Sequence, residues 1–144
     1  MANIRRDYMI TLDISRAGHR GIIKLDRNIF FYVSERDTRN IFLVIKGTDL
    51  DDVNISMLIA NNRGIEVARL EGKRHEPSIA EYDIPNDLEV GNYKAQFLIQ
   101  DATLDKILTS DPFEFKIKEN LFTEEIIWEM MSIWNYMNNL SRWL

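Results

Sequence analysis

The chain has 144 residues, of which 45% are hydrophobic and 28% charged, and its 18 Lys and Arg against 23 Asp and Glu leave a net charge of −5. This composition is typical of a single globular domain and excludes an intrinsically disordered chain. The acidic balance argues against nucleic acid as a partner, because phosphate binding requires a clustered basic surface.

Cysteine is absent. Its absence excludes a disulfide framework, a thiolate nucleophile and a zinc–thiolate site, and it fits assembly in a reducing cytoplasm. Near the start of the chain, Thr11 and Asp13 interrupt the apolar run, so no targeting segment is expected. No stretch is long and apolar enough to predict a transmembrane helix, so membrane insertion is not expected.

From Tyr8 to about Ile117 the hydrophobic pattern has a period of two, which is typical of half-buried strands. In the first strand, 8–14, Ile10 and Leu12 share the inward face. Later strands place further side chains inward, namely Phe97, Ile99, Phe113 and Phe115. The remaining strand-like segments are 22–33, whose boundaries the pattern does not place, and 41–46, 53–60, 65–70, 79–84, 93–100, 106–110 and 113–118.

Turn signals separate these segments at 47–52, 61–64 and 85–87, and the polar stretch 71–78 is interpreted as a connection. Short strands at this spacing predict a mainly β fold, an immunoglobulin-like antiparallel β-sandwich over residues 1–120. Tyr93, placed just before a strand, favours this arrangement, because such a corner tyrosine hydrogen-bonds back to the preceding loop.

At Leu121 the period changes to that of a helix, and 121–144 is predicted to be a C-terminal amphipathic α-helix. Thr123 is the expected N-cap, with Glu124 and Glu125 in the first turn. The helix would extend roughly 30–36 Å. Its apolar residues alternate spacings of four and three, which is a heptad pattern; they are Ile126, Met130, Ile133, Met137, Leu140 and Leu144.

The apolar stripe also has aromatic shoulders, with Ile127 and Trp134 on one side and Tyr136 and Trp143 on the other. A stripe this wide exceeds the seam of a dimeric coiled coil and suits a helix with two neighbours, or one lying on another protein. Trp128 falls near the polar side and is expected to pack back on the sandwich. The predicted interface comprises Ile126, Ile127, Met130, Ile133, Trp134, Met137, Leu140, Trp143 and Leu144.

Three locations are open for this helix: its own sandwich, a membrane surface, or copies of itself and a partner protein. The membrane surface is disfavoured because the polar face carries Asn and Glu with Arg142 as its one basic residue. An exposed apolar stripe on a monomer would promote aggregation. The sequence therefore favours an assembly element, and a homo-oligomer with a trimer as the first guess.

Catalytic and metal-binding patterns are weak. His19 and His75 have no partner motif in the sequence. The turn containing Asp49, Asp51 and Asp52 lacks the ligand spacing, glycine and distal Glu of a calcium-binding loop, so a solvated turn is favoured. No phosphate-binding loop, nucleophile elbow or zinc-ligand spacing occurs. We expect no enzyme activity, no catalytic residue, no metal and no cofactor.

Five stretches together resemble the N-terminal domain of the baseplate upper protein (BppU) family of phages that infect Gram-positive bacteria. They are "ITLDI", "SERDTRNIFLVIK", "VNISMLIANNRGIEV", "GNYKAQFLIQD" and "SDPFEFKIKENL". The resemblance covers roughly residues 8–120 in strand order and turn placement.

The resemblance implies an immunoglobulin-like sandwich followed by a helix, in a structural virion protein assembled in the bacterial host. It also implies attachment to the central tail hub and to receptor-binding proteins further out, with no catalytic residues. Residues 121–144 fall where the family's helix belongs. The chain departs from larger members by stopping at Leu144; it is either a fragment or a short member whose helix is the whole connecting device.

Two other functions stay open on the sequence. One is a carbohydrate- or receptor-binding β-sandwich of a phage or bacterial surface protein. Such modules carry exposed aromatic residues on strands or loops, whereas all three tryptophans here lie in the predicted helix. The other, more remote function is an accessory domain of a bacterial enzyme.

Overall fold

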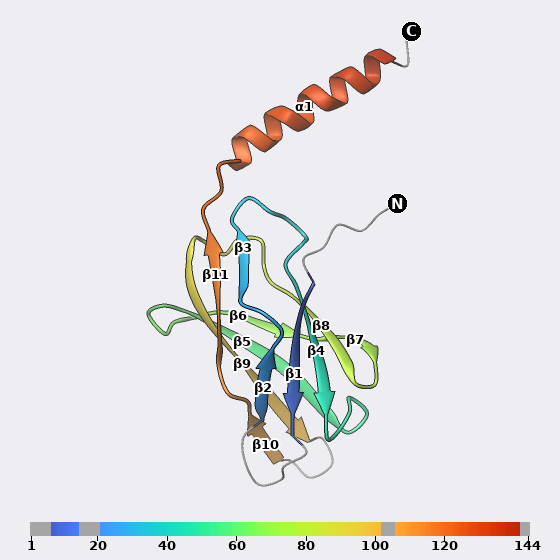
Figure 1. The fold of residues 1–144 in the computed structure, drawn as a ribbon, viewed down its shortest axis with the longest axis vertical. Helices are drawn as coiled ribbons and strands as arrows, with labels where there is room; N and C mark the ends of the chain where they lie inside the picture. Colours follow the sequence, from blue (N-terminus) through green and yellow to red (C-terminus); the bar gives the residue numbers. More distant parts are fainter. Residues whose placement is uncertain (1–6, 15–20, 102–105, 142–144) are drawn as a thin grey trace.

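The computed structural model describes residues 7–14, 21–101 and 106–141. Two β-sheets pack face to face and a single helix follows them (Figure 1), which confirms the predicted mainly β, immunoglobulin-like sandwich with a C-terminal helix. The first sheet has the order β2 (Ile22–Leu25), β1 (Tyr8–Asp13), β4 (Asn40–Lys46), β8 (Ile79–Asp83) and β7 (Lys73–Glu76).

The second sheet has the order β3 (Ile29–Tyr32), β11 (Phe113–Lys118), β9 (Gly91–Asp101), β5 (Val53–Asn61) and β6 (Glu66–Glu71), and β10 (Lys106–Thr109) also pairs with β9. The pairs are antiparallel except for β1 with β4 and β3 with β11, which are parallel. Parallel strands require a long crossover, and here β2 and β3 lie in the chain between β1 and β4.

The core lies between the two sheets, and the side chains predicted to point inward are all buried there. Ile10 and Leu12 come from the first sheet, and Phe97, Ile99, Phe113 and Phe115 from the second. Alternating strands with one apolar face can bury that face only against a second layer, so the period-two pattern was sufficient to predict this core.

The chain passes directly from one sheet to the other at two edges. Segment 22–33, which the sequence left undivided, forms β2 in the first sheet and β3 in the second. At the opposite edge, β6 and β7 are separated by Gly72, where a Cβ atom would lie 2.8 Å from the ring of Tyr82. The Tyr82 hydroxyl donates a 2.6 Å hydrogen bond to the Ile55 carbonyl oxygen, which links the two sheets.

The interpretation of 71–78 as a polar connection was wrong, because this stretch contains β7. All four residues of β7 are exposed and ionisable. Charged side chains on an edge strand prevent edge-to-edge aggregation. A strand of this kind has no apolar alternation, so the hydrophobic pattern could not reveal it.

The corner tyrosine is confirmed. Tyr93 is buried, and its hydroxyl donates a 2.6 Å hydrogen bond to the backbone carbonyl oxygen of Glu89 in the preceding loop. This bond fixes the β8–β9 loop against the start of β9. Burial, and then the carboxylate of Glu89, raise the pKa of the Tyr93 phenol.

We expect Tyr93→Phe to lower the free energy of unfolding by about 1 kcal/mol at neutral pH, because the Glu89 carbonyl oxygen loses its donor. An unfolded tyrosine ionises near pH 10, so the stabilisation from the raised pKa is complete below that pH and is lost as the pH rises further. Urea unfolding of both proteins should therefore show a stability difference that shrinks above about pH 10. Equal stability at neutral pH would contradict a structural role for this bond.

Candidate assembly interface

The helix α1 spans Glu124–Ser141 and begins as predicted. The Thr123 hydroxyl oxygen accepts a 3.3 Å hydrogen bond from the Ile126 backbone amide, and the Thr123 carbonyl oxygen accepts one of 3.0 Å from Ile127. Glu124 and Glu125 occupy the first turn, where the helix dipole favours negative charge. Of the predicted interface residues, Trp143 and Leu144 lie outside the described residues.

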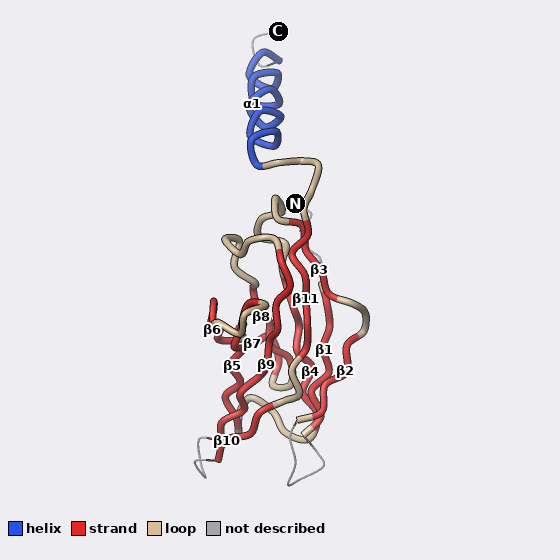
Figure 2. Tube along the Cα trace, turned by 90° about the vertical axis from the view of Figure 1, so that its left-hand side faces the viewer, coloured by secondary structure: helices blue, strands red, loops and turns tan. Residues whose placement is uncertain are grey.

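The helix lies beyond one end of the sandwich and points away from it (Figures 1 and 2). Because no strand lies beside it, its apolar stripe is open to solvent. The described residues of the heptad stripe share one face and are 40–63% exposed; they are Ile126, Met130, Ile133, Met137 and Leu140. This arrangement differs from the alternative in which the helix packs on its own sandwich.

The shoulders of the stripe are also open. Trp134 and Tyr136 are exposed, and Ile127 is half-buried. Exposed Met131, which the sequence prediction did not include, lies one turn after Ile127 on the same side. The spacing of Ile127, Met131 and Trp134 repeats the four-and-three pattern of the main stripe. This spacing in the sequence would have been enough to include Met131 in the predicted interface.

The expectation that Trp128 packs on the sandwich was wrong. Trp128 is 57% exposed, and with Ser34 and Arg36 it lines a cavity of about 310 Å³ between the helix and the β3–β4 loop. No strand residue lines this cavity among the described residues. The helix projects past the ends of the strands, so its start faces the β3–β4 and β8–β9 loops.

The start of the helix is held by the β3–β4 loop, residues 33–39. Asn120, in the segment between β11 and α1, donates a 2.9 Å hydrogen bond from its side-chain amide to the Ser34 hydroxyl oxygen. Arg36 donates to the carboxylate of Glu124 at 2.5 Å, forming an ion pair with the first helical turn. Both contacts fix where the helix leaves the sandwich.

The same loop is anchored to the sandwich by Arg39, which is only 1% exposed. Its guanidinium donates hydrogen bonds to the backbone carbonyl oxygens of Pro85 (2.8 Å), Tyr32 (3.2 Å) and Val33 (3.1 Å). Burial lowers the pKa of Arg39, and the Glu35 carboxylate opposes that shift. One buried cation thus joins the end of β3 to the β8–β9 loop.

A second link joins the same two loops. The Asp37 backbone amide donates to the Asn86 side-chain oxygen at 3.1 Å, and the Asn86 amide donates to the Asp37 carboxylate at 3.0 Å. Asp37 has a positive φ of 57°, a conformation that Asp tolerates better than most residues. The loop that holds the helix is therefore itself held in place.

The residues considered for catalysis or metal binding have ordinary polar partners where the structure describes them. His19 lies outside the described residues, and the Nε2 atom of His75 lies 2.9 Å from the carboxylate of Glu81. Asp51 pairs with Arg74 at 2.7 Å, and its backbone amide donates to the Asp49 carboxylate. Over the described ranges, no group of three or more His, Cys, Asp or Glu side chains is arranged to hold a metal ion.

The described part of the chain contains no helix that is both long and apolar enough to cross a bilayer. The chain matches no family model and no curated protein. Among solved structures it is similar to CopC from Methylosinus trichosporium OB3b, at 21% sequence identity and a TM-score of 0.46, over 65% of this chain and 85% of that chain. A likeness at this level carries no inference about function.

Proposed function

We propose that this chain is a structural, non-enzymatic component of a phage tail tip or baseplate. In this proposal the sandwich docks on the tail hub, and α1 joins copies of the chain and links them to receptor-binding proteins. The sequence resemblance over residues 8–120 supports the phage context. The observation that carries the assembly role is the exposed apolar stripe of α1.

The composition of α1 favours a partner. Most of the stability of a protein helix comes from packing of its amphipathic face, and the 18 residues of α1 include Ile, Trp, Tyr, Asn and Ser. These residue types have lower helix propensity than alanine. Large exposed apolar patches also mark interaction sites on soluble proteins. We therefore infer that contacts with another chain supply much of the stability of α1.

Copies of the same helix are the partner that the pattern favours. Ile126 and Ile133 alternate with Met130 and Met137 along the stripe. In heptad terms, β-branched residues then occupy the d positions and unbranched ones the a positions, which favours three or more strands over two. The broad shoulder beside Trp134 is consistent with more than one neighbouring helix.

The phage role is tested on particles produced from a phage genome that carries this gene. An antibody against the sandwich should label the tail tip in negative-stain electron microscopy, and mass spectrometry of purified tails should find the chain in several copies. Particles made without the gene are the control and should not be labelled. Absence of the chain from purified particles, while it is abundant in the lysate, would refute the proposal.

A further inference from the structure

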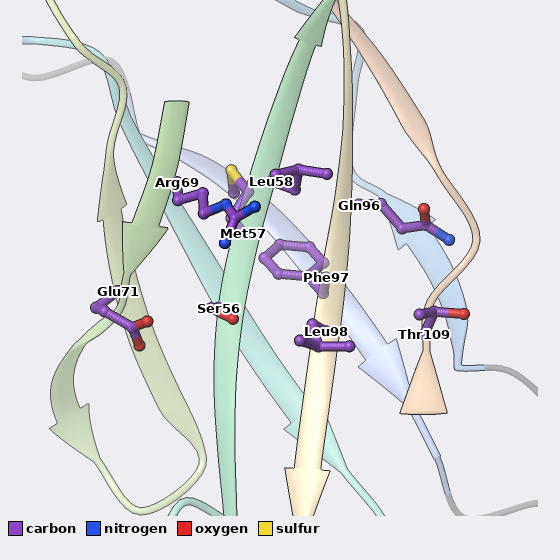
Figure 3. Close-up of a pocket in the computed structure, with 9 residues that line it drawn as sticks. All are labelled: Ser56, Met57, Leu58, Arg69, Glu71, Gln96, Phe97, Leu98 and Thr109. Carbon is purple, nitrogen blue, oxygen red and sulfur yellow. The ribbon is translucent and has the colours of Figure 1, made fainter. Parts of the chain in front are cut away.

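A second open apolar site lies on the outer face of the second sheet, far from α1. A cavity of about 340 Å³ lies over β5 and β9. Figure 3 shows the residues that line it. Leu58 and Leu98 point outward here and are 40% and 38% exposed. The small side chain of Ser56 stands beside them and leaves the cavity hollow. Two exposed leucines beside an open cavity form an apolar patch, and contiguous apolar patches mark interaction sites.

The strand register arranges this face in two rows. In the first row Leu58 stands between Arg69 on β6 and Gln96 on β9. In the second row Ser56 stands between Glu71 on β6 and Leu98 on β9. Each strand therefore contributes two side chains, and the two rows are two residues apart along the strands.

We propose that this face binds the same face of a second copy of the chain, about a two-fold axis that crosses the strands between the two rows. Such an axis exchanges the rows. Arg69 then lies opposite Glu71 of the second copy, and its Glu71 opposite Arg69 of the second copy. Leu58 enters the hollow above Ser56 of the other copy, so a large side chain faces a small one. Two sheets packed in this way lie about 10 Å apart.

The charges on this face agree with that pairing. Within the described residues no ion pair is formed by Glu71. Arg69 pairs with Glu66, and the Arg69 side chain is still 76% exposed. The next rows outward bring Asn54 opposite Ala60 and Gln100 opposite Lys94, so no like charges meet. A self-complementary patch of this kind is what a two-fold interface requires.

The contact is small, so it should be weak by itself. Stable interfaces bury about 800 Å² on each partner, and the hollow with its two leucines forms only the centre of such an area. The face is separate from the helix stripe, so the two contacts act independently. In the Ile133→Asp variant, whose helix is expected not to self-associate, the sheet face alone is expected to double the mass at high concentration. In a helix-mediated oligomer each copy carries one such face, so the contact would link oligomers further.

The test is sedimentation velocity of the full-length Ile133→Asp variant, whose helix is expected not to self-associate, from low to high micromolar concentration. We expect a doubling of mass, weakened about tenfold or more when Arg69→Glu or Glu71→Arg is added, since each places like charges together. Adding Arg69→Glu and Glu71→Arg together should restore the doubling, because the pair is reversed. Leu58→Glu should abolish it, whereas Met9→Glu, on the exposed outer face of the first sheet, should not.

Two outcomes would overturn this inference: a mass that never doubles, or a double variant as weak as its two parents. Cooperative thermal unfolding of each variant shows that it is folded. The result does not depend on the helix, because the Ile133→Asp background removes helix assembly, which is measured separately by comparing the masses of the wild-type chain and this variant. Failure of the sheet contact and failure of helix assembly are therefore distinguishable.

Discussion

Ile133→Asp is expected to convert a homo-oligomer, with a trimer as our first guess, into a folded monomer. Ile133 is central in the stripe of α1 and is exposed in the single chain, so its replacement disturbs no contact within the sandwich. Burying one such side chain is worth about 1.5–3 kcal/mol, and a trimer would lose about 5–9 kcal/mol in total before the cost of burying three charges. Light scattering after size-exclusion chromatography measures the mass directly.

The same variant should lose helical circular dichroism, because packing of the apolar face supplies most of the stability of a protein helix. Thermal unfolding of the sandwich should be retained, as it should in a chain ending at Asn120. Asn135→Asp, on the opposite face of the helix, is the matched control and should leave the mass unchanged. A wild-type chain that is monomeric at high micromolar concentration would show that self-association is wrong and that the stripe binds a different protein.

Arg39→Ala is expected to lower the free energy of unfolding by about 3–5 kcal/mol, because three backbone carbonyl oxygens at a closed end of the sandwich lose their donor. The loops that Arg39 joins also hold the start of α1, through Ser34 and Arg36. The variant should therefore loosen the helix attachment as well. Urea unfolding gives the stability, and hydrogen exchange of residues 33–39 reports the loop.

Arg36→Ala is the matched control, three residues away on the same loop. The Arg36 side chain is 52% exposed and makes a surface ion pair with Glu124, so its loss should cost less than about 1 kcal/mol. The comparison separates a buried arginine that serves as a hydrogen-bond donor from an exposed one that serves as a charge. Equal effects of the two substitutions would contradict the structural role assigned to Arg39.

Several features followed from local sequence alone. Alternation placed Ile10, Phe97 and Phe113 on inward faces, and all three are buried. The cap at Thr123 and the hydrogen bond of Tyr93 were predicted from nearby residues, and both are present. These features depend on contacts within a few residues or on the two-residue repeat of a strand, so a short window of sequence contains the necessary information.

Hydrophobic periodicity was enough to predict the two-layer β fold and the position and apolar stripe of the C-terminal helix. The folded chain was needed to show that β7 is a charged edge strand, that Arg39 is buried, and that Leu58 and Leu98 lie together on an outer face. Periodicity specifies which side of a strand is apolar but not which strand lies beside it. Neighbours such as β1 and β4, or β5 and β9, are chosen by packing between distant segments, and that choice brings together residues that no local pattern connects.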